Sequence, residues 1–352
     1  MTQTYRNAAG IGNRSLGWPF AVKARQLHGL VCGAASCLIV AHDYPDPDCL
    51  GAAFGLQRLL RYWRIPRVSI TFGGFIGRAE NRALISLLNI KTIPFARVDP
   101  RRYDRIILVD CFPGNGNVSL PCDVRVDAVI DHHRRRTAHS AIPFSDIRPG
   151  IAATSTIITG YLLACGAPID RTLATALYYG IRTDSGQMTR HVSDHDLACY
   201  AFLFNRVSHH TLGAIENPDL DGDYFRTIHD SIENMRSWGP AGFIRVSRTG
   251  TPDHIAEIAD YLFRLRDLQW LICCGKVNDS LFFSVRSRTS ARAGRYAERI
   301  SREFGGNGGG HAKVAAGTIP LHGRPAKTVT DAFFKSFRRL LRIKTRRPSR
   351  LI

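Results

Sequence analysis

The sequence predicts an α/β protein with two domains, and three observations support this prediction. Short apolar runs alternate with amphipathic helical patterns through the first half of the 352 residues. A second set of strand and helix patterns begins after the Gly-Pro-Ala-Gly segment at 239–242. Such alternation is typical of a mainly parallel sheet flanked by helices, and a chain of this length can bury two cores. We therefore expect a mainly parallel N-terminal domain, a helical connector and a smaller C-terminal α/β domain.

The domain boundaries follow from the changes in pattern along the chain. Residues 1–34 carry Arg and Lys and are expected to form a peripheral N-terminal extension. We assign 35–205 to the first domain, 206–238 to the helical connector and 239–340 to the second domain. Residues 341–352 belong to a basic, partly amphipathic tail whose pattern already begins at Lys335.

Composition narrows the class of protein. The formal net charge of +19 predicts a polyanionic partner such as a nucleotide or nucleic acid, with a solvated basic surface as the alternative. No apolar run approaches the roughly twenty residues that a membrane-spanning helix needs, and the N-terminus lacks a secretory pattern. The 9 cysteines form no C-x-x-C pair, and several, such as Cys37, Cys111 and Cys273-Cys274, resemble small core residues, which fits a reducing compartment. We expect a cytoplasmic protein without stable membrane association.

The first strand and helix enclose an acidic turn. Ser36–Ala41 is apolar, the polar turn 42–51 follows, and a helical pattern begins at Ala52. The turn contains His42, Asp46 and Asp48, and the two acids flank a proline whose fixed φ favours their presentation. The alternative is structural, since Asp48 could cap the helix and the other acid could be solvated.

Further strands of the first domain also end on polar residues. The run 106–109 ends on Asp110, and 126–130 leads into Asp131-His132-His133. The carboxyl ends of parallel strands form one edge of a sheet, where α/β proteins place their sites. The remaining predicted elements of this domain are a strand at 68–72 and helices at 78–88, 152–165 and 171–179. The last helix is expected to break at 180–186, a loop that presents Asp184 or forms an Asx-turn with it.

The second domain repeats the alternation on a smaller scale. Strands are predicted at 243–246, 269–274 and 280–285, and helices at 255–265 and 292–304. A glycine-rich run then ends on His311. Glycine allows a close approach of the backbone to a ligand, whereas the alternative is a flexible linker.

Six side chains of the first domain form a candidate metal site. Carboxylates with some imidazole suit Mn²⁺ or Mg²⁺ better than a thiolate-preferring metal. Two divalent ions about 3.5–4 Å apart can activate a hydroxide and neutralise phosphoryl charge. The candidate ligands are His42, Asp46, Asp48, Asp110, His132 and Asp184.

Taken together, these motifs resemble a known family. The matching positions are His42–Gly51, Asp110, Asp131-His132-His133, Gly180–Gly186, Ser284–Arg288 and Gly305–His311. In this order they resemble the DHH phosphoesterases with a DHH-associated C-terminal domain, specifically the NrnA-like branch of nano-RNases and pAp phosphatases. Pro47, Ala52 and Asn307 depart from the family pattern without removing a ligand.

The resemblance implies a role for each metal ligand. One ion would be held by His42, Asp46 and Asp110. The second would be held by Asp48, Asp110, His132 and Asp184, so that Asp110 bridges the two ions.

The resemblance also implies catalytic and substrate-binding roles. His133 would contact the scissile phosphate, and Asp131 would orient a neighbouring histidine. Arg286 and His311 would bind the nucleotide, and the backbone of Gly308, Gly309 and Gly310 would contact phosphate. The active site would lie in a cleft between the two domains.

The predicted function is a phosphohydrolase with two divalent ions, most simply Mn²⁺, that degrades very short RNA to mononucleotides. Dephosphorylation of 3′-phosphoadenosine 5′-phosphate (pAp) to AMP is expected as well. The alternatives are a RecJ-type single-strand DNA exonuclease, disfavoured because no further domain follows the glycine-rich motif, and a linear or cyclic dinucleotide phosphodiesterase. A pyrophosphatase is less favoured, and the non-enzymatic alternative is a nucleotide- or RNA-binding protein. The expected partners are short single-stranded RNA and nucleotide substrates, and the sequence is compatible with a homodimer.

Overall fold

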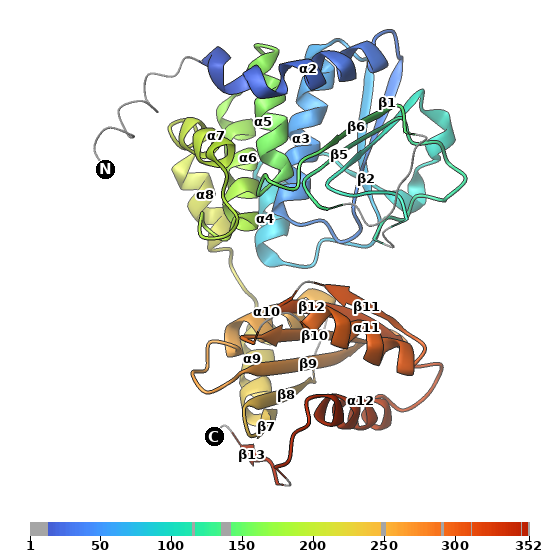
Figure 1. Ribbon diagram of the computed structural model, residues 1–352, viewed down its shortest axis with the longest axis vertical. Helices are drawn as coiled ribbons and strands as arrows, with labels where there is room; N and C mark the ends of the chain where they lie inside the picture. The colour runs from blue at the N-terminus through green and yellow to red at the C-terminus, as the bar shows by residue number, and fades with distance from the viewer. Residues whose placement is uncertain are drawn as a thin grey trace. The chain divides into compact units, whose positions relative to one another are not determined.

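The computed structural model contains two compact units, Met1–Pro218 and Asp219–Ile352, and each is described by itself (Figure 1). The structure describes residues 13–114, 117–134, 142–247, 251–289, 292–310, 312–345 and 347–350.

The first unit is built on a six-stranded parallel sheet with the order β3-β2-β1-β4-β5-β6. Alternate residues of the central strand β1 face opposite sides, as the strand period of two requires. Ile39 packs against the helices, whereas Leu38 and Val40 face a second apolar layer. The prediction of a mainly parallel sheet is therefore confirmed. The strands are β1 (Ser36–Ala41), β2 (Arg67–Phe72), β3 (Ile93–Pro94), β4 (Arg105–Val109), β5 (Ala128–Asp131) and β6 (Phe144–Ile147).

Helices pack closely against this sheet, and Figure 1 shows α3 and α5 side by side. Glycines allow α3 to approach its neighbours: a Cβ on Gly51 would lie 2.7 Å from the carbonyl oxygen of Ala176 in α6. This close packing places the first turn of α3 beside α5 and α6. The helices are α2 (Asn13–Val31), α3 (Pro47–Tyr62), α4 (Ala79–Leu87), α5 (Thr154–Ala164), α6 (Arg171–Asp184), α7 (Asp194–Phe204) and α8 (His209–Glu216). Two short 3₁₀ turns, η1 (Phe95–Arg97) and η2 (Pro100–Arg102), precede β4.

Two segments differ from the expected domain organisation. Most of the expected N-terminal extension forms α2, whose Phe20, Ala24 and Leu27 are fully buried in the core of the first unit. These residues recur at helical spacing, so α2 is part of the first unit rather than peripheral to it. The expected connector is divided, because α8 packs into the first unit and α9 (Gly222–Asn234) packs on strand β8 of the second.

The end of α6 also differs from the prediction. The helix continues through Gly180 to Asp184 instead of breaking at Gly180. A Cβ at Gly180 would lie 2.4 Å from Ser155 Oγ, so this glycine serves close packing inside a helix. Asp184 is therefore presented from a helix end and not from a glycine-bracketed loop.

The second unit contains a seven-stranded sheet with the order β11-β12-β10-β9-β8-β7-β13. Its strands pair antiparallel except for the parallel pair β8 and β9. Helix α10 (Pro252–Leu262) covers one face, and α11 (Ala293–Glu303) and α12 (Ala326–Leu340) cover the other. The strands are β7 (Arg236–Trp238), β8 (Ala241–Val246), β9 (Trp270–Val277), β10 (Ser280–Ser287), β11 (Asn307–Gly310), β12 (Val314–Pro320) and β13 (Ser349–Arg350).

Strands β7, β12 and β13 were not predicted, and two further segments of the second unit differ from the prediction. The glycine-rich run forms β11, an edge strand paired with β12. Helix α12 buries Val329, Phe333 and Phe337, so the basic segment that begins at Lys335 starts inside a packed helix.

Candidate metal centre

Predicted site residues gather at the carboxyl edge of the parallel sheet. Strand pairing places Ala41 beside Val109, and Val109 beside Ile130. The residues that follow these strands therefore begin next to one another, as expected for parallel strands.

Asp110 is the centre of this arrangement. Its side chain is buried, and its backbone has a φ of 59°, a left-handed conformation that costs a non-glycine residue on the order of 1 kcal/mol. Oδ2 of Asp110 lies 3.6 Å from His42 Nε2, and Oδ1 lies 3.5 Å from His132 Nε2. The Thr154 hydroxyl donates a hydrogen bond of 2.7 Å to Oδ1. One carboxylate thus faces two histidines from two different strand ends.

Asp48 approaches the same place from the first turn of α3. The side chain is fully buried, and its two oxygens accept N–H bonds of 2.7 Å from Thr154 and 2.8 Å from Ser155. These donors belong to the first turn of α5, where unpaired N–H groups favour a negative charge. Burial nevertheless raises the pKa of Asp48 well above its usual range, and the nearby Asp110 and Asp184 carboxylates raise it further.

Asp46 has a structural role in addition to the ligand role implied for it. Its Oδ1 accepts the backbone N–H of Cys49 at 3.0 Å, so Asp46 is the N-cap of α3. The side chain is half exposed, and Oδ1 lies 3.9 Å from His42 Nε2. The alternative in which Asp48 caps this helix is therefore wrong, because Asp46 is the cap and Asp48 points towards α5.

His132 lies between carboxylates. Its Nε2 is 3.0 Å from Asp184 Oδ2, and this nitrogen is buried without a hydrogen bond of good geometry among the described residues. The other ring nitrogen, Nδ1, lies 3.2 Å from the carbonyl oxygen of Ile151, which orients the ring. Burial lowers the pKa of His132, but the surrounding carboxylates outweigh burial and raise it to about 11.

His133 and Asp131 form a separate pair. Asp131 Oδ1 accepts the backbone N–H of His133 at 3.0 Å and lies 2.9 Å from its Nδ1. Asp131 is buried, whereas the His133 side chain is 42% exposed. The contact fixes the ring of His133 and leaves its Nε2 free to meet a ligand. The hydrogen bond that the His133 ring donates to Asp131 raises the pKa of His133.

These side chains form three overlapping groups with the composition of divalent-ion sites. Within each group, the possible ligand atoms lie within 4.8 Å of one another. Burial raises the pKa of Asp110 to about 6, because a buried carboxylate is costly to ionise, and the nearby Asp46 carboxylate adds to this effect. The buried, unpaired Nε2 of His132 and the crowded acids therefore fit a bound divalent ion. The groups are His42 with Cys49 and Asp110, Asp110 with His132 and His133, and Asp48 with His132 and Asp184.

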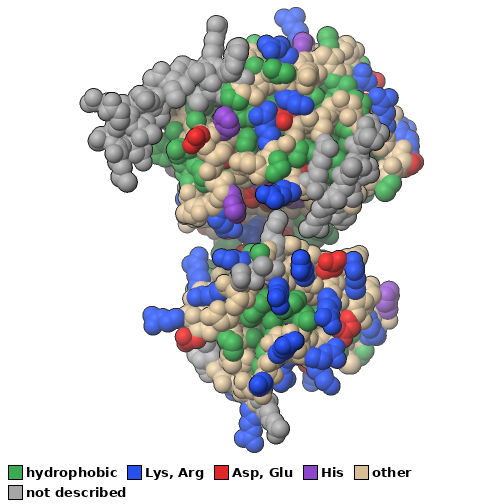
Figure 2. All heavy atoms as spheres, viewed as in Figure 1, with side chains coloured by type: hydrophobic (Ala, Val, Ile, Leu, Met, Phe, Trp, Pro, Cys, Tyr) green, Lys and Arg blue, Asp and Glu red, His purple; other side chains and the backbone are tan. Residues whose placement is uncertain are grey.

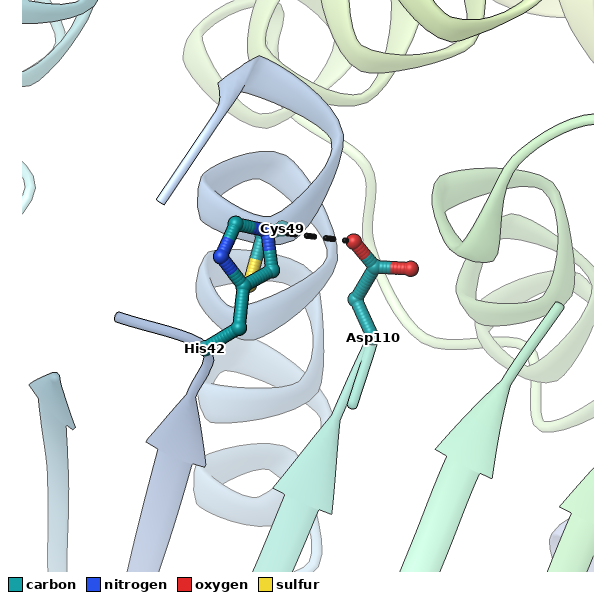
Figure 3. Close-up of side chains that lie close together, drawn as sticks. All are labelled: His42, Cys49 and Asp110. Carbon is teal, nitrogen blue, oxygen red and sulfur yellow. Dashed lines mark ion pairs between the residues drawn. The ribbon is translucent and has the colours of Figure 1, made fainter. Parts of the chain in front are cut away.

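Cys49 is the member of these groups that sequence reasoning missed. Figure 3 shows its sulfur beside the ring of His42, with Asp110 facing both. A cysteine at the start of an amphipathic helix looks like a core residue. Its position one residue after Asp48, in the motif that carries the acids, was the available signal.

The predicted substrate-binding residues lie in the second unit. Arg286 is buried, and its Nε donates to Asp260 at 2.6 Å while Nη1 donates to Ser284 Oγ at 2.7 Å. Gly308, Gly309 and Gly310 belong to the edge strand β11. A Cβ on Gly308 would lie 2.9 Å from the Ala297 carbonyl oxygen, so this glycine permits packing on α11. His311 lies outside the described residues.

The fold and site define a two-unit α/β protein with a candidate metal centre, and family comparisons agree with the two-unit fold. Residues 36–181 match the model of the DHH family, N-terminal domain, and residues 242–342 match the DHHA1 domain. The two matches together cover more than half of the chain. The protein belongs to the DHH phosphoesterase family.

Several proteins are similar to this chain. An uncharacterized protein of Methanocaldococcus jannaschii is 31% identical over 289 residues, which are 82% of this chain and 58% of that protein. An A-adding tRNA nucleotidyltransferase of Geobacter sulfurreducens is 27% identical over 80% of this chain and 32% of its own length. A probable manganese-dependent inorganic pyrophosphatase of Lactococcus lactis is 24% identical over 46% of this chain and 53% of its own length. The chain thus spans between about a third and somewhat more than half of these relatives.

A solved structure supports the two-unit fold. The crystal structure of an exopolyphosphatase-related protein from Bacteroides fragilis superposes with a TM-score of 0.71 and covers 91% of this chain and 98% of its own. Its sequence identity of 16% makes this a likeness of fold alone. Among the described residues, none of the helices has the length and apolar character to cross a bilayer.

Proposed function

We propose that this protein is a metal-dependent phosphohydrolase that degrades very short RNA to mononucleotides and dephosphorylates pAp to AMP. The observation that carries the proposal is the position of Asp110, whose carboxylate faces His42 with one oxygen and His132 with the other. Such a carboxylate is suited to bridge two divalent ions. Two bound ions would supply an activated hydroxide and neutralise charge on the phosphoryl oxygens.

Mn²⁺ is the proposed ion at both positions, with Mg²⁺ as the alternative. Carboxylate and imidazole donors suit Mn²⁺, and the name of the Lactococcus lactis relative includes manganese dependence. His42, Asp46 and Asp110 would hold one ion, and Asp48, Asp110, His132 and Asp184 the other. Asp46 would then have to combine ligation with its role as helix cap.

The remaining residues of the centre act on substrate and protons. Asp131 holds the ring of His133 through Nδ1, so Nε2 of His133 is available to donate a proton to a phosphate oxygen. This arrangement assigns substrate contact to His133 and a positioning role to Asp131. Asp48 is oriented by two backbone N–H groups in the first turn of α5.

A nucleotide substrate accounts for the features of the second unit. Figure 2 shows Lys and Arg side chains spread over the visible face of this unit, and Arg302 and Arg339 are about three-quarters exposed. Positive side chains of this kind attract a polyanion. Arg286, His311 and the backbone of Gly308–Gly310 are the proposed nucleotide contacts. Because Asp260 and Ser284 occupy part of the Arg286 guanidinium, only its remaining N–H groups could reach a phosphate.

Cleavage of pyrophosphate or polyphosphate is the second candidate function. It is favoured by the name of the manganese-dependent pyrophosphatase relative, whose similarity covers 46% of this chain. Both candidates use the same ions and differ in whether a nucleoside is recognised. We also propose that the protein is located in the cytoplasm and forms a homodimer.

Rates with Mn²⁺ on a panel of substrates test the proposal. The panel contains the dinucleotide pApA, longer RNA, single-stranded DNA, pAp, cyclic di-AMP and pyrophosphate. We expect the fastest release of mononucleotide from pApA, with pAp also cleaved. Preference for pyrophosphate would favour the second candidate, and preference for single-stranded DNA or cyclic di-AMP would replace the substrate class. Binding of RNA without cleavage of any substrate would overturn the enzymatic proposal.

A further inference from the structure

A cavity in the second unit is lined by aromatic rings and by basic side chains. It lies between α11 and the carboxyl end of α12, two helices that pack on the same face of the sheet (Figure 1). Its volume is about 800 Å³. Cavities that bind small ligands measure roughly 300–1,000 Å³. None of the described residues that are proposed to contact substrate lines this cavity, so it is a second, separate set of side chains.

Two stacked aromatic rings form one wall of the cavity. Trp270 is the first residue of β9, and Tyr296 lies on α11. Their ring centroids are 5.5 Å apart, and the ring planes are inclined by 23°. Both side chains are only partly buried, so the pair presents an aromatic surface to the cavity. Such surfaces suit a nucleobase, because every base has a π-face that can stack on a ring.

Helical spacing brings basic side chains to the same wall. Arg292 is the N-cap of α11, and Tyr296 and Arg299 follow it at intervals of four and three residues. Residues with this spacing share one face of a helix. Arg292 and Arg299 are exposed and have no ion-pair partner among the described residues. Their two positive charges therefore remain uncompensated beside the aromatic rings.

The carboxyl end of α12 supplies the opposite wall. Nη2 of Arg339 donates to Glu303 Oε1 at 3.0 Å, and the Ser336 hydroxyl donates to the same oxygen at 2.8 Å. Arg339 and Glu303 thus neutralise each other. Arg342, which also lines the cavity, has no ion-pair partner among the described residues and adds a third uncompensated charge.

Arg342 occupies a backbone position that normally favours glycine. It follows the end of α12 with a φ of 54°. Its N–H bonds to the carbonyl oxygen of Arg339, and the N–H of Ile343 bonds to that of Arg338, both at 3.1 Å. This pattern is the helix ending in which glycine usually takes the left-handed position. An arginine there is strained, and strain of this kind indicates that the side chain does more than end the helix.

The helix dipole alone does not explain these arginines. A dipole stabilises basic residues at the carboxyl end of a helix and destabilises them at the amino end. This accounts for Arg339 in the last turn of α12, but not for Arg292 at the start of α11. A polyanion in the cavity would stabilise the positive charge at both helix ends.

We propose that this cavity binds a nucleoside di- or triphosphate at a site additional to the proposed hydrolysis. The base stacks on the surface formed by Trp270 and Tyr296. Arg292, Arg299 and Arg342 contact the phosphates, because guanidinium groups donate paired N–H bonds to phosphate oxygens. Three uncompensated arginines match a ligand with several negative charges. The binding forms and breaks no covalent bond and uses no ion of the metal centre.

Calorimetric titration of the full-length protein with ATP tests this site. EDTA is present throughout, so that no divalent ion occupies the metal centre. The proteins are wild type, Arg342→Gly and Arg295→Ala. Arg342→Gly removes one guanidinium and relieves the left-handed strain, so its thermal stability should equal or exceed that of wild type. Arg295→Ala is the matched control, because Arg295 is exposed on α11 beside Tyr296 but does not line the cavity.

We expect wild type and Arg295→Ala to bind ATP with similar affinity, and Arg342→Gly to bind it about tenfold more weakly or worse. Tripolyphosphate lacks the base and AMP has a single phosphate, so each should bind wild type about tenfold more weakly than ATP. Tyr296→Leu should weaken the binding of ATP while leaving that of tripolyphosphate unchanged.

Absence of ATP binding to wild type, or equal affinity in wild type and Arg342→Gly, would overturn the site. A 5′-phosphorylated RNA oligomer that binds more tightly than ATP and is lost in Arg342→Gly would overturn the nucleotide and assign the cavity to RNA. Hydrolysis of pApA with Mn²⁺ should be the same in Arg342→Gly and wild type, and a loss would contradict a separate site. Failure of wild type to cleave pApA would contradict only the proposed function.

Discussion

The two halves of the candidate metal centre meet at Asp110, which faces a histidine of each half, but they are built by different means. One half combines Asp110 with His42 and Cys49 at adjacent strand ends. The other combines Asp48, from the first turn of α3, with His132 and Asp184. In that half the carboxylate of Asp48 is held by two backbone N–H groups of α5.

The difference shows how one short motif reaches both halves of the centre. Asp48 and Cys49 are consecutive in α3, and consecutive helical side chains diverge by about 100°. The carboxylate therefore points to α5 and α6, while the thiol points to β1 and β4. A one-residue change in this motif should affect one half and spare the other, whereas a change at Asp110 should affect both.

Loss of the shared carboxylate is expected to have the largest effect. Asp110→Ala should lower hydrolysis of pApA by about a thousandfold or more, because both ions lose a ligand. Rates with Mn²⁺ and the number of ions bound per chain would be measured together. Asp123→Ala, which removes an exposed aspartate paired with Arg101, is the control and should match wild type. An Asp110→Ala protein that keeps both ions would show that the halves are not joined there.

Asp48→Asn should affect only the half that contains Asp184. We expect one bound ion instead of two and a loss of hydrolysis of about a hundredfold. The metal-free variant should unfold at the same or a higher denaturant concentration than wild type. The reason is that the raised pKa of Asp48 means its ionised form is disfavoured in the folded, metal-free protein. A marked loss of metal-free stability would instead indicate that the bonds from α5 make Asp48 structural.

His133→Asn tests the proposal that His133 contacts the substrate and binds neither ion. It should lower kcat by about a hundredfold while both ions stay bound. Asp131→Asn should have a smaller effect of the same kind, because the amide oxygen can still accept from Nδ1 of His133 but the carboxylate charge that strengthens this hydrogen bond is lost. Metal analysis and steady-state kinetics on the two variants distinguish this role from ligation, since loss of an ion in His133→Asn would make the histidine a ligand.

The smallest expected effect is on metal affinity, which should depend on pH because protons compete with metal ions for groups in both halves. The pKa of Asp110 is raised to about 6 and that of His132 to about 11, so metal-free protein holds protons where an ion would bind. Between pH ~6 and ~8 Asp110 loses its proton, and the falling proton concentration makes it easier for an ion to displace the proton that His132 still holds, so metal affinity should increase over this range. Calorimetry in buffers of different ionisation enthalpy would count the protons released. Affinity independent of pH would contradict binding at these groups.

Much of the centre could be predicted because its residues follow apolar strands in the sequence. The parallel order of β1, β4 and β5 brings His42, Asp110 and His132 to one edge, and a pattern of strands and helices is enough to foresee this. The exact partners could not be foreseen. Whether Asp46 or Asp48 caps α3 depends on where the helix starts, and it starts at Pro47 rather than Ala52.

Packing explains the other differences. Gly180 was predicted to break the helix, but it lies inside α6. A glycine is needed there because Ser155 leaves no room for a Cβ. Helix α2 looked peripheral because its buried residues only become a core stripe when α5 is beside it. Cys49 had no predicted role, and only the folded strand ends show that His42 and Asp110 lie around it.

Electron paramagnetic resonance of the protein loaded with Mn²⁺ alone tests the central claim that Asp110 joins two metal positions. Two ions bridged by one carboxylate are close enough for their spins to couple. We predict two bound ions per chain with an exchange-coupled spectrum in wild type, and loss of the coupling in Asp110→Ala. A wild-type spectrum of isolated Mn²⁺, or a coupled spectrum that survives in Asp110→Ala, would contradict the account.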